Sequence, residues 1–322
     1  VANRKTNRQN QQKKEIKKIT ISGGIRYDTR NIDVKNLLDG NAIKGTAFKK
    51  SFSNISGSIG LAAQATDKLN FKLNIARGFR APSIPELASN GAHEGTNRYE
   101  YGDAGLKSET SLQFDGGFDY SAEHLSIGIS SFYNRFSNFI FYSKLEAAGG
   151  GDSLVNVNGD IIPAFKFNQR KASLAGFEAK LDIHPHPLDW LHIENSFSFV
   201  SGRFAAVLDG SKNIPFIPAP KLVTELRSNF DHLKGAVHNF YIKLELDNTF
   251  TQRNVFTAYD TETKTKGYSL LNLGVGADFV NKKEQALFSL SLSALNITDV
   301  AYQNHLSRLK YAAENLATGR TG

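Results

Sequence analysis

The sequence predicts an all-β protein, an antiparallel transmembrane β-barrel of which about 11 strands are visible. Apolar and polar residues alternate with a period of two over long segments, the connections between these segments alternate in length, and the chain lacks a long apolar run. A membrane-spanning helix needs roughly 18 or more apolar residues, whereas a barrel strand needs only about 9 to 11 alternating ones. The 23 Phe, 11 Tyr and 27 Gly among 322 residues are a mixture typical of many strands.

Alternation is clearest in the segments 68–75, 240–247 and 288–295. In 68–75 every odd-numbered residue is Leu, Phe or Ile and every even-numbered residue is Lys or Asn, so one face is apolar and the other polar. Similar runs predict eleven strands, at 18–30, 51–65, 68–80, 110–121, 124–141, 164–184, 189–203, 220–231, 238–252, 268–280 and 285–297. Strands of soluble sandwiches usually have about five or six residues, and the greater length here favours a bilayer.

The connections between these strands take turns in length. Short links at 66–67, 121–123, 185–188 and 281–284 alternate with long ones at 31–50, 81–109 and 143–163. Short turns at one rim and long loops at the other are the plan of an outer-membrane barrel. Charged residues such as Glu178 and Asp182 on one strand face need water, which a barrel lumen supplies. Trp190 and Tyr120 lie near short turns, where an aromatic girdle is expected.

Charge and composition divide the chain and exclude several functions. The net charge of +8 is concentrated at the start, since the first 18 residues hold seven Lys or Arg and one acidic residue. We expect 1–17 to be a basic polar segment or turn and 18–322 to be a partial outer-membrane β-barrel. Basic residues interleaved with stacking aromatics are not found, so nucleic acid is not an expected partner.

The sequence lacks cysteine, methionine and the common catalytic motifs, and these absences restrict the possible functions. Without cysteine the chain has no disulfide and no thiolate nucleophile or metal ligand, and without methionine we expect a processed or truncated product. The sequence contains no Gly-x-Ser-x-Gly elbow, phosphate loop, dinucleotide fingerprint or His-Glu-x-x-His motif. We therefore expect that the protein is not an enzyme.

Four short motifs follow one another over about two thirds of the chain. They are Phe79-Arg80-Ala81-Pro82 at a strand end, Gly105-Leu106-Lys107 before the next strand, Gly176-Phe177-Glu178, and Asn296-Ile297-Thr298-Asp299 followed by Tyr302. In this order they resemble segments of the TonB-dependent receptors. The resemblance implies 22 strands, so that the visible strands form the second half of a barrel whose closing strand and N-terminal plug are missing. It also implies long extracellular loops and short periplasmic turns.

The resemblance further implies a function and partners. A TonB-dependent receptor of the bacterial outer membrane takes up a metal chelate, such as a ferric siderophore or haem, or a similar large nutrient, by energy-coupled gating. TonB would act through the missing plug, lipid and lipopolysaccharide would surround the barrel, and no intrinsic cofactor is expected. A passive porin and a surface-binding barrel are the alternatives.

The long loop 81–109 and Arg80, the strand residue just before it, supply the candidate ligand-binding residues, with loop packing as the alternative role. These candidates are Arg80, His93, Glu94, Arg98, Tyr99 and Tyr101. Arginine offers a bidentate fork and tyrosine an amphipathic face to an anionic iron chelate. Haem receptors that resemble this chain carry a histidine in the interval that His93 occupies, and an imidazole can ligate haem iron.

Two other sets of histidines are open to alternative interpretations. His184 and His186 flank Pro185 in an expected periplasmic turn, with a spacing that could hold a metal ion or serve a polar turn. His305, near the end of the chain, could face the ligand. The alternative for His305 is a loop stabilised by packing of Leu306 and Leu309.

Overall fold

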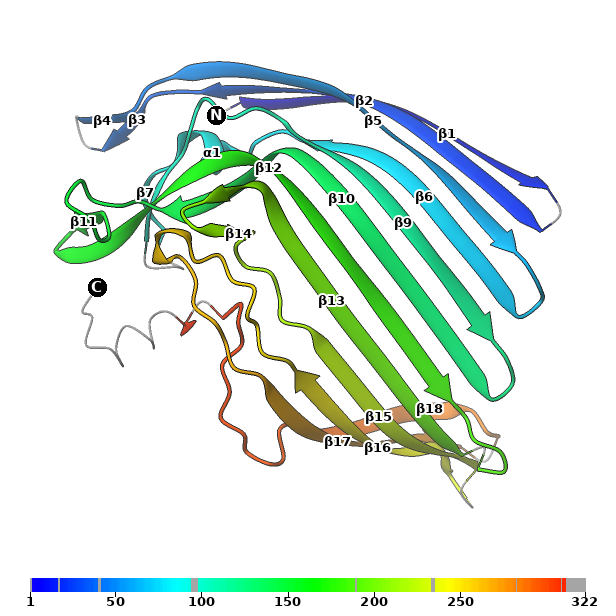
Figure 1. The fold of residues 1–322 in the computed structure, drawn as a ribbon. Coiled ribbons are helices and arrows are strands. Elements are labelled where there is room, and N and C mark those ends of the chain that lie inside the picture. Colours follow the sequence, from blue (N-terminus) through cyan, green and yellow to red (C-terminus); the bar gives the residue numbers. More distant parts are fainter. Residues whose placement is uncertain are drawn as a thin grey trace.

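A single curved sheet of long strands makes up most of the molecule (Figure 1). The computed structural model describes residues 2–310 except 17, 40–41, 94–97, 189, 233–234, 282 and 308. In these residues no helix has the length and apolar character needed to cross a bilayer.

Twelve long strands pair in chain order, each antiparallel to its neighbour. They are β1 (Ala2–Ile16), β2 (Ile19–Val34), β5 (Phe48–Gln64), β6 (Leu69–Arg80), β9 (Glu109–Ser121), β10 (Leu125–Lys144), β12 (Asp160–Ile183), β13 (Leu191–Leu208), β15 (Lys221–His232), β16 (Val237–Thr249), β17 (Tyr268–Val280) and β18 (Ala286–Ala294). All eleven predicted strands are present. Within the described residues β1 pairs only with β2, and β18 only with β17.

Strand β1 lies within 1–17, the segment for which a basic polar segment or turn is expected. Its backbone pairs with β2 from Ala2 opposite Asp33 to Ile16 opposite Ile19. The segment is almost uniformly polar, so it shows no alternation for a pattern search to find. Pairing requires only backbone donors and acceptors, which the edge of β2 supplies whatever the side chains are.

Short turns lie at one end of the sheet and long loops at the other, as predicted (Figure 1). The long loops contain short elements of their own: β3 (Leu37–Asp39), β4 (Ala42–Gly45), α1 (Ile84–Ala88), β7 (Asn90–His93), β8 (Arg98–Tyr101), β11 (Leu154–Val157), β14 (Ser211–Asn213) and a 3-10 helix at Ala258–Asp260. Aromatic pairs lie near the short turns, where Trp190 stacks on Phe230 and Phe279 on Phe288.

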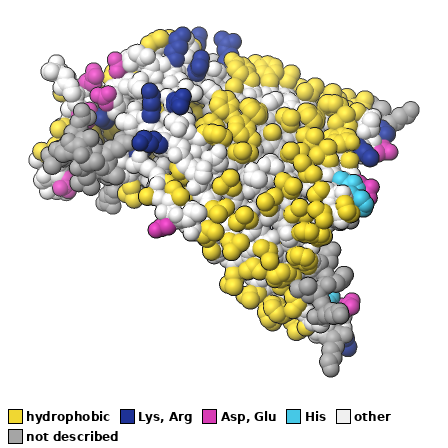
Figure 2. All heavy atoms as spheres, turned by 60° about the horizontal axis from the view of Figure 1, so that its bottom comes forward, with side chains coloured by type: hydrophobic (Ala, Val, Ile, Leu, Met, Phe, Trp, Pro, Cys, Tyr) yellow, Lys and Arg dark blue, Asp and Glu magenta, His cyan; other side chains and the backbone are white. Residues whose placement is uncertain are grey.

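The two faces of the sheet differ in polarity, and the large apolar side chains of one face are exposed. On β6, Phe71, Leu73 and Ile75 are exposed, and Figure 2 shows a continuous apolar surface. On the other face Lys72 contacts Asp119 at 2.6 Å, while the Asn74 amide donates to Asp115 at 2.9 Å. A soluble sheet would bury its apolar face, so this arrangement fits a barrel wall with lipid outside and water inside.

Candidate functional site

The base of the loop 81–109 is fixed by an ion-pair cluster at the end of β6. Arg80 Nη1 lies 2.8 Å from both carboxylate oxygens of Glu86, and Arg80 Nη2 lies 3.4 Å from Glu109. Glu86 also accepts from the backbone amide of Ser83, whose hydroxyl accepts from the amide of Glu86, and this capping box begins α1. The Arg80 guanidinium is therefore engaged by two carboxylates of its own chain.

An apolar cluster lies beneath this ion-pair cluster. The motif residue Ala81 is buried there with Leu87 and Leu106, against side chains from β2, β5 and β10. These side chains are Ile32, Val34, Phe52 and Ile140. Pro82 is also fully buried. The burial of both Ala81 and Leu106 shows that the two motifs, far apart in the loop, serve the same packing site.

The Gly105-Leu106-Lys107 motif is held mainly through its backbone. The Leu106 carbonyl accepts from Lys50 at 3.1 Å. The Lys107 amide donates to the side chain of Gln169 at 2.8 Å, and its carbonyl accepts from the same side chain at 2.6 Å. Sequence reasoning missed Lys50 and Gln169 because they lie on other strands, and no local spacing connects them to the motif.

Between these two anchored ends the loop forms the hairpin of β7 and β8. Strand β8 pairs in parallel with β12, so the hairpin extends the sheet at the long-loop rim. Arg98 contacts Glu100 at 2.6 Å, and its guanidinium lies 3.9 Å from the ring centre of Tyr142. A cation over an aromatic face is favourable, so Tyr142 supports the hairpin from β10.

The structure brings four of the predicted site residues together in this hairpin. His93 is exposed and lies opposite Arg98. Tyr99 is buried, with its hydroxyl donating to Asn90 at 2.8 Å, and its ring lies 4.9 Å from that of the half-buried Tyr101. Arg80 is separate, at the loop base. Glu94 lies outside the described residues.

A second buried polar cluster lies in other long loops and contains His305. The Glu262 carboxylate is fully buried and accepts from the backbone amides of Phe216 at 2.6 Å and Phe256 at 2.8 Å. His305 lies 3.5 Å from this carboxylate through Nε2 and 2.8 Å from Thr265 through Nδ1. Sequence reasoning missed Glu262, which has no distinguishing pattern around it.

The packing role expected for the neighbours of His305 is not observed. Leu306 and Leu309 are 45% and 75% exposed, whereas His305 is 3% exposed. The segment is held instead by polar contacts, since Lys310 also donates to the Thr263 carbonyl at 2.6 Å. A buried His305 is not positioned to meet a ligand at the mouth of the barrel.

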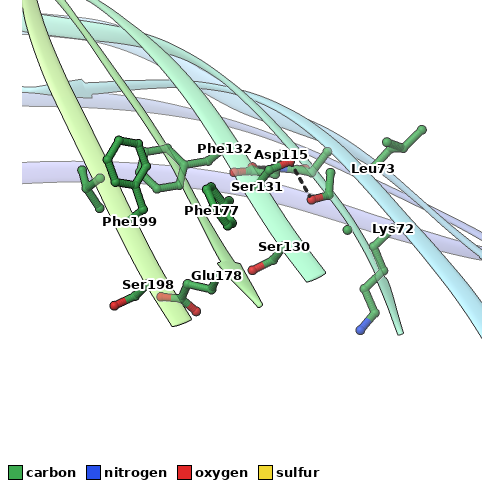
Figure 3. Close-up of a pocket in the computed structure, with 14 residues that line it drawn as sticks. Lys72, Leu73, Asp115, Ser130, Ser131, Phe132, Phe177, Glu178, Ser198 and Phe199 are labelled. Carbon is green, nitrogen blue, oxygen red and sulfur yellow. Dashed lines mark hydrogen bonds between the residues drawn. The ribbon is translucent and has the colours of Figure 1, made fainter. Parts of the chain in front are cut away.

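A hollow of about 390 Å³ lies in the wall between β6 and β13. Lys72, Ser130, Glu178 and Ser198 occupy one cross-strand row at this hollow and point to the same side of the sheet (Figure 3). Gly117 completes the row between Lys72 and Ser130. A Cβ at Gly117 would lie 2.8 Å from the carbonyl oxygen of Ile129, so glycine permits the close approach of β9 and β10 there. The row gives the lumen wall a polar surface.

The exposed apolar face, the polar inner face and the long loops at one rim define a barrel of the outer membrane. Residues 10–297 match the family described as TonB dependent receptor-like, beta-barrel. The chain belongs to this family, so the resemblance of its motifs and the predicted location in the outer membrane are confirmed.

Known relatives agree with this assignment. The ferric enterobactin receptor of Pseudomonas aeruginosa is 30% identical over 162 residues, which cover 46% of this chain and 20% of that receptor. The copper transporter OprC has a TM-score of 0.70 at 16% identity, over 91% of this chain and 42% of that one. The unliganded ferric citrate transporter FecA has a TM-score of 0.64 at 17% identity, over 93% and 41%.

These relatives are receptors and transporters rather than enzymes, in agreement with the prediction. At 16% and 17% identity the two solved structures support the fold alone. The chain spans about two fifths of the length of each solved structure, and its match covers one fifth of the curated receptor.

Proposed function

We propose that this chain is the ligand-receiving part of a TonB-dependent transporter for a ferric chelate, with a ferric siderophore as the leading class. TonB would act through a plug domain outside the chain, and further strands would close the barrel. The observation that carries the proposal is the hairpin of β7 and β8, which two anchored loop segments hold at the long-loop rim. Family membership and the relative that receives ferric enterobactin support the ligand class.

The proposal divides the predicted site residues into two roles. His93, Arg98 and Tyr101 lie on the hairpin with accessible atoms, and we assign them to the ligand. Arg80 lies at the loop base, apart from the hairpin, and the Tyr99 side chain is buried, so we assign both a positioning role. Glu94 stays a proposed contact.

A direct binding measurement tests this proposal. We expect the full-length protein in detergent to bind ferric enterobactin or ferric citrate saturably by isothermal titration calorimetry. Arg98→Gln should weaken binding about tenfold, because a hydrogen bond from a charged group contributes about 1.5–3 kcal/mol. Lys212→Gln removes the same charge from another long loop and should leave the affinity unchanged.

Other outcomes of the same experiment separate the alternatives. If the protein binds haem and neither ferric chelate, and His93→Ala abolishes haem binding, the ligand is haem rather than a siderophore. A steady ion conductance in planar bilayers, with no saturable ligand, would favour a passive porin. If Arg98→Gln and Lys212→Gln weaken ligand binding equally, the hairpin is not part of the binding site.

We infer a second partner, lipopolysaccharide, from a row of arginines on the outer face. Arg77, Arg135 and Arg203 are exposed and are joined in cross-strand register through Leu112 and Ser173. Two strand spacings separate successive arginines, which is about 10 Å. Figure 2 shows Lys and Arg side chains gathered beyond one border of the apolar surface. Guanidinium groups just beyond the apolar surface, on the side of the long loops, would contact the lipopolysaccharide phosphates of the outer leaflet.

Removing this charge should weaken lipopolysaccharide binding. A basic residue near an anionic membrane surface contributes about 1 kcal/mol, so the triple change of Arg77, Arg135 and Arg203 to Gln should weaken binding to lipopolysaccharide micelles by about tenfold or more. Changing Lys212, Lys264 and Lys266 to Gln removes equal charge from the loops and is the control. An equal loss in both triple variants would show a nonspecific charge effect.

A further inference from the structure

The opposite rim, at the short turns, carries a cluster of histidines and an aspartate. Asp182 lies near the end of β12, His184 follows that strand, and His192 lies at the start of β13. Their ligand atoms all lie within 4.8 Å of one another. Figure 2 shows histidine side chains next to acidic ones at an edge of the molecule.

The strand register explains why these side chains meet. Asp182 pairs with Glu194 and Ile183 with Ile193, so the next position of the same ladder places His184 opposite His192. Asp182 and His184 are two residues apart on an extended chain and therefore share a face, the polar one. The hairpin thus fixes three potential ligands from two strands on one side of the sheet.

The contacts within the cluster leave coordinating atoms available. His184 Nε2 lies 2.9 Å from Asp182 Oδ2, and the rings of His184 and His192 are 4.1 Å apart. The other oxygen, Asp182 Oδ1, is buried and has no hydrogen-bond partner among the described residues. A buried carboxylate oxygen without a partner is costly, and a bound cation would remove that cost.

Charged side chains of both signs lie near the cluster, including Lys180, two residues before Asp182 on the same face of β12. Glu194 faces Asp182 across the hairpin, which places a second carboxylate beside the cluster. The adjacent Arg227, opposite His192 on β15, is directed elsewhere: its Nε donates to Asn229 at 2.8 Å, and its guanidinium lies 4.2 Å from the ring centre of Tyr241.

We propose that Asp182, His184 and His192 form a binding site for a divalent transition-metal ion of the Zn²⁺ or Cu²⁺ type at the periplasmic rim. Two imidazoles and one carboxylate are a donor set that suits these ions. Zn²⁺ binds such ligands at about 2.0–2.2 Å. Small rotations of the three side chains would bring their ligand atoms to this distance from one ion. Water completes the coordination. The ion would join β12 to β13 below their last ladder pairs, independently of any ligand bound at the long loops.

Copper titration with electron paramagnetic resonance tests the site. The detergent-purified full-length protein should bind one high-affinity equivalent of Cu²⁺, with hyperfine structure from two imidazole nitrogens, and Zn²⁺ should displace it. His184→Asn and His192→Asn should each weaken binding at least tenfold. Asp182→Asn should weaken it as well while leaving both nitrogens in the spectrum. His238→Asn, on another strand near the same rim, should change neither affinity nor spectrum.

Specific results would overturn the proposal. These are the absence of a saturable equivalent, a spectrum without nitrogen couplings, or unchanged binding in the His184 and His192 variants. In that case the 2.9 Å contact of His184 with Asp182 is a structural hydrogen bond only. Because the wild-type spectrum is an independent measurement, poor folding of one variant does not remove the test.

Discussion

Glu262→Ala is expected to release the long loops around the 3-10 helix, with a loss of about 3 kcal/mol or more in local stability. The carboxylate is fully buried and accepts from two backbone amides, those of Phe216 and Phe256. Its removal leaves both donors and His305 without their partner in a water-poor site. Each buried polar group left without a hydrogen-bond partner costs about 1–3 kcal/mol, so the total loss of local stability is large.

Hydrogen exchange of the amides of Phe216 and Phe256 measures this loss directly. Their protection should fall by about a hundredfold or more, given that about 1.4 kcal/mol corresponds to tenfold. Glu146→Ala removes an exposed carboxylate from another long loop and should change protection by less than about 0.5 kcal/mol. Unchanged protection in Glu262→Ala would mean that packing of Phe256 alone holds these loops.

Leu73→Arg is expected to destabilise the barrel by about 2–4 kcal/mol, the cost of arginine at the bilayer midplane. Leu73 lies near the middle of β6 and is 58% exposed on the apolar face. The neighbouring Asn74 points to the other face, where its amide donates to Asp115. Asn74→Arg keeps a donor beside that carboxylate and should change stability by less than about 1 kcal/mol, since a lumen site retains water.

The contrast between adjacent positions makes this a test of which face meets lipid. Both variants would be folded into phospholipid vesicles, and their unfolding free energies would be compared by urea titration. A larger loss for Asn74→Arg than for Leu73→Arg would reverse the assignment of the two faces.

Alternation predicted the strands well wherever one face meets lipid and the other water. The pattern fails beyond that belt. Strand β5 begins at Phe48 and β12 at Asp160, a few residues before their predicted starts, because the ends at the long-loop rim pack against loops and are not selected for alternation. Strand β1 was missed for a related reason, since its pairing depends on the backbone.

The candidate site was predictable in composition and not in geometry. The loop 81–109 stood out by its histidine, arginine and tyrosines, and four of these do lie together in the hairpin. The partners that determine their roles could not be predicted: Glu86 and Glu109 at Arg80, Tyr142 beneath Arg98, and His192 beside His184. Each of these contacts depends on strand register or loop path, which no local spacing encodes.

The stacking of Trp190 on Phe230 has a practical consequence for spectroscopy. Trp190 is the only tryptophan in the sequence, and it lies two residues from His192 at the short-turn rim. This chain therefore carries its single tryptophan at the end of the barrel opposite the β7–β8 hairpin. Quenching by paramagnetic Cu²⁺ would report on events at the periplasmic rim, and tryptophan emission that responds to an extracellular ligand would be a sign of communication along the length of the barrel.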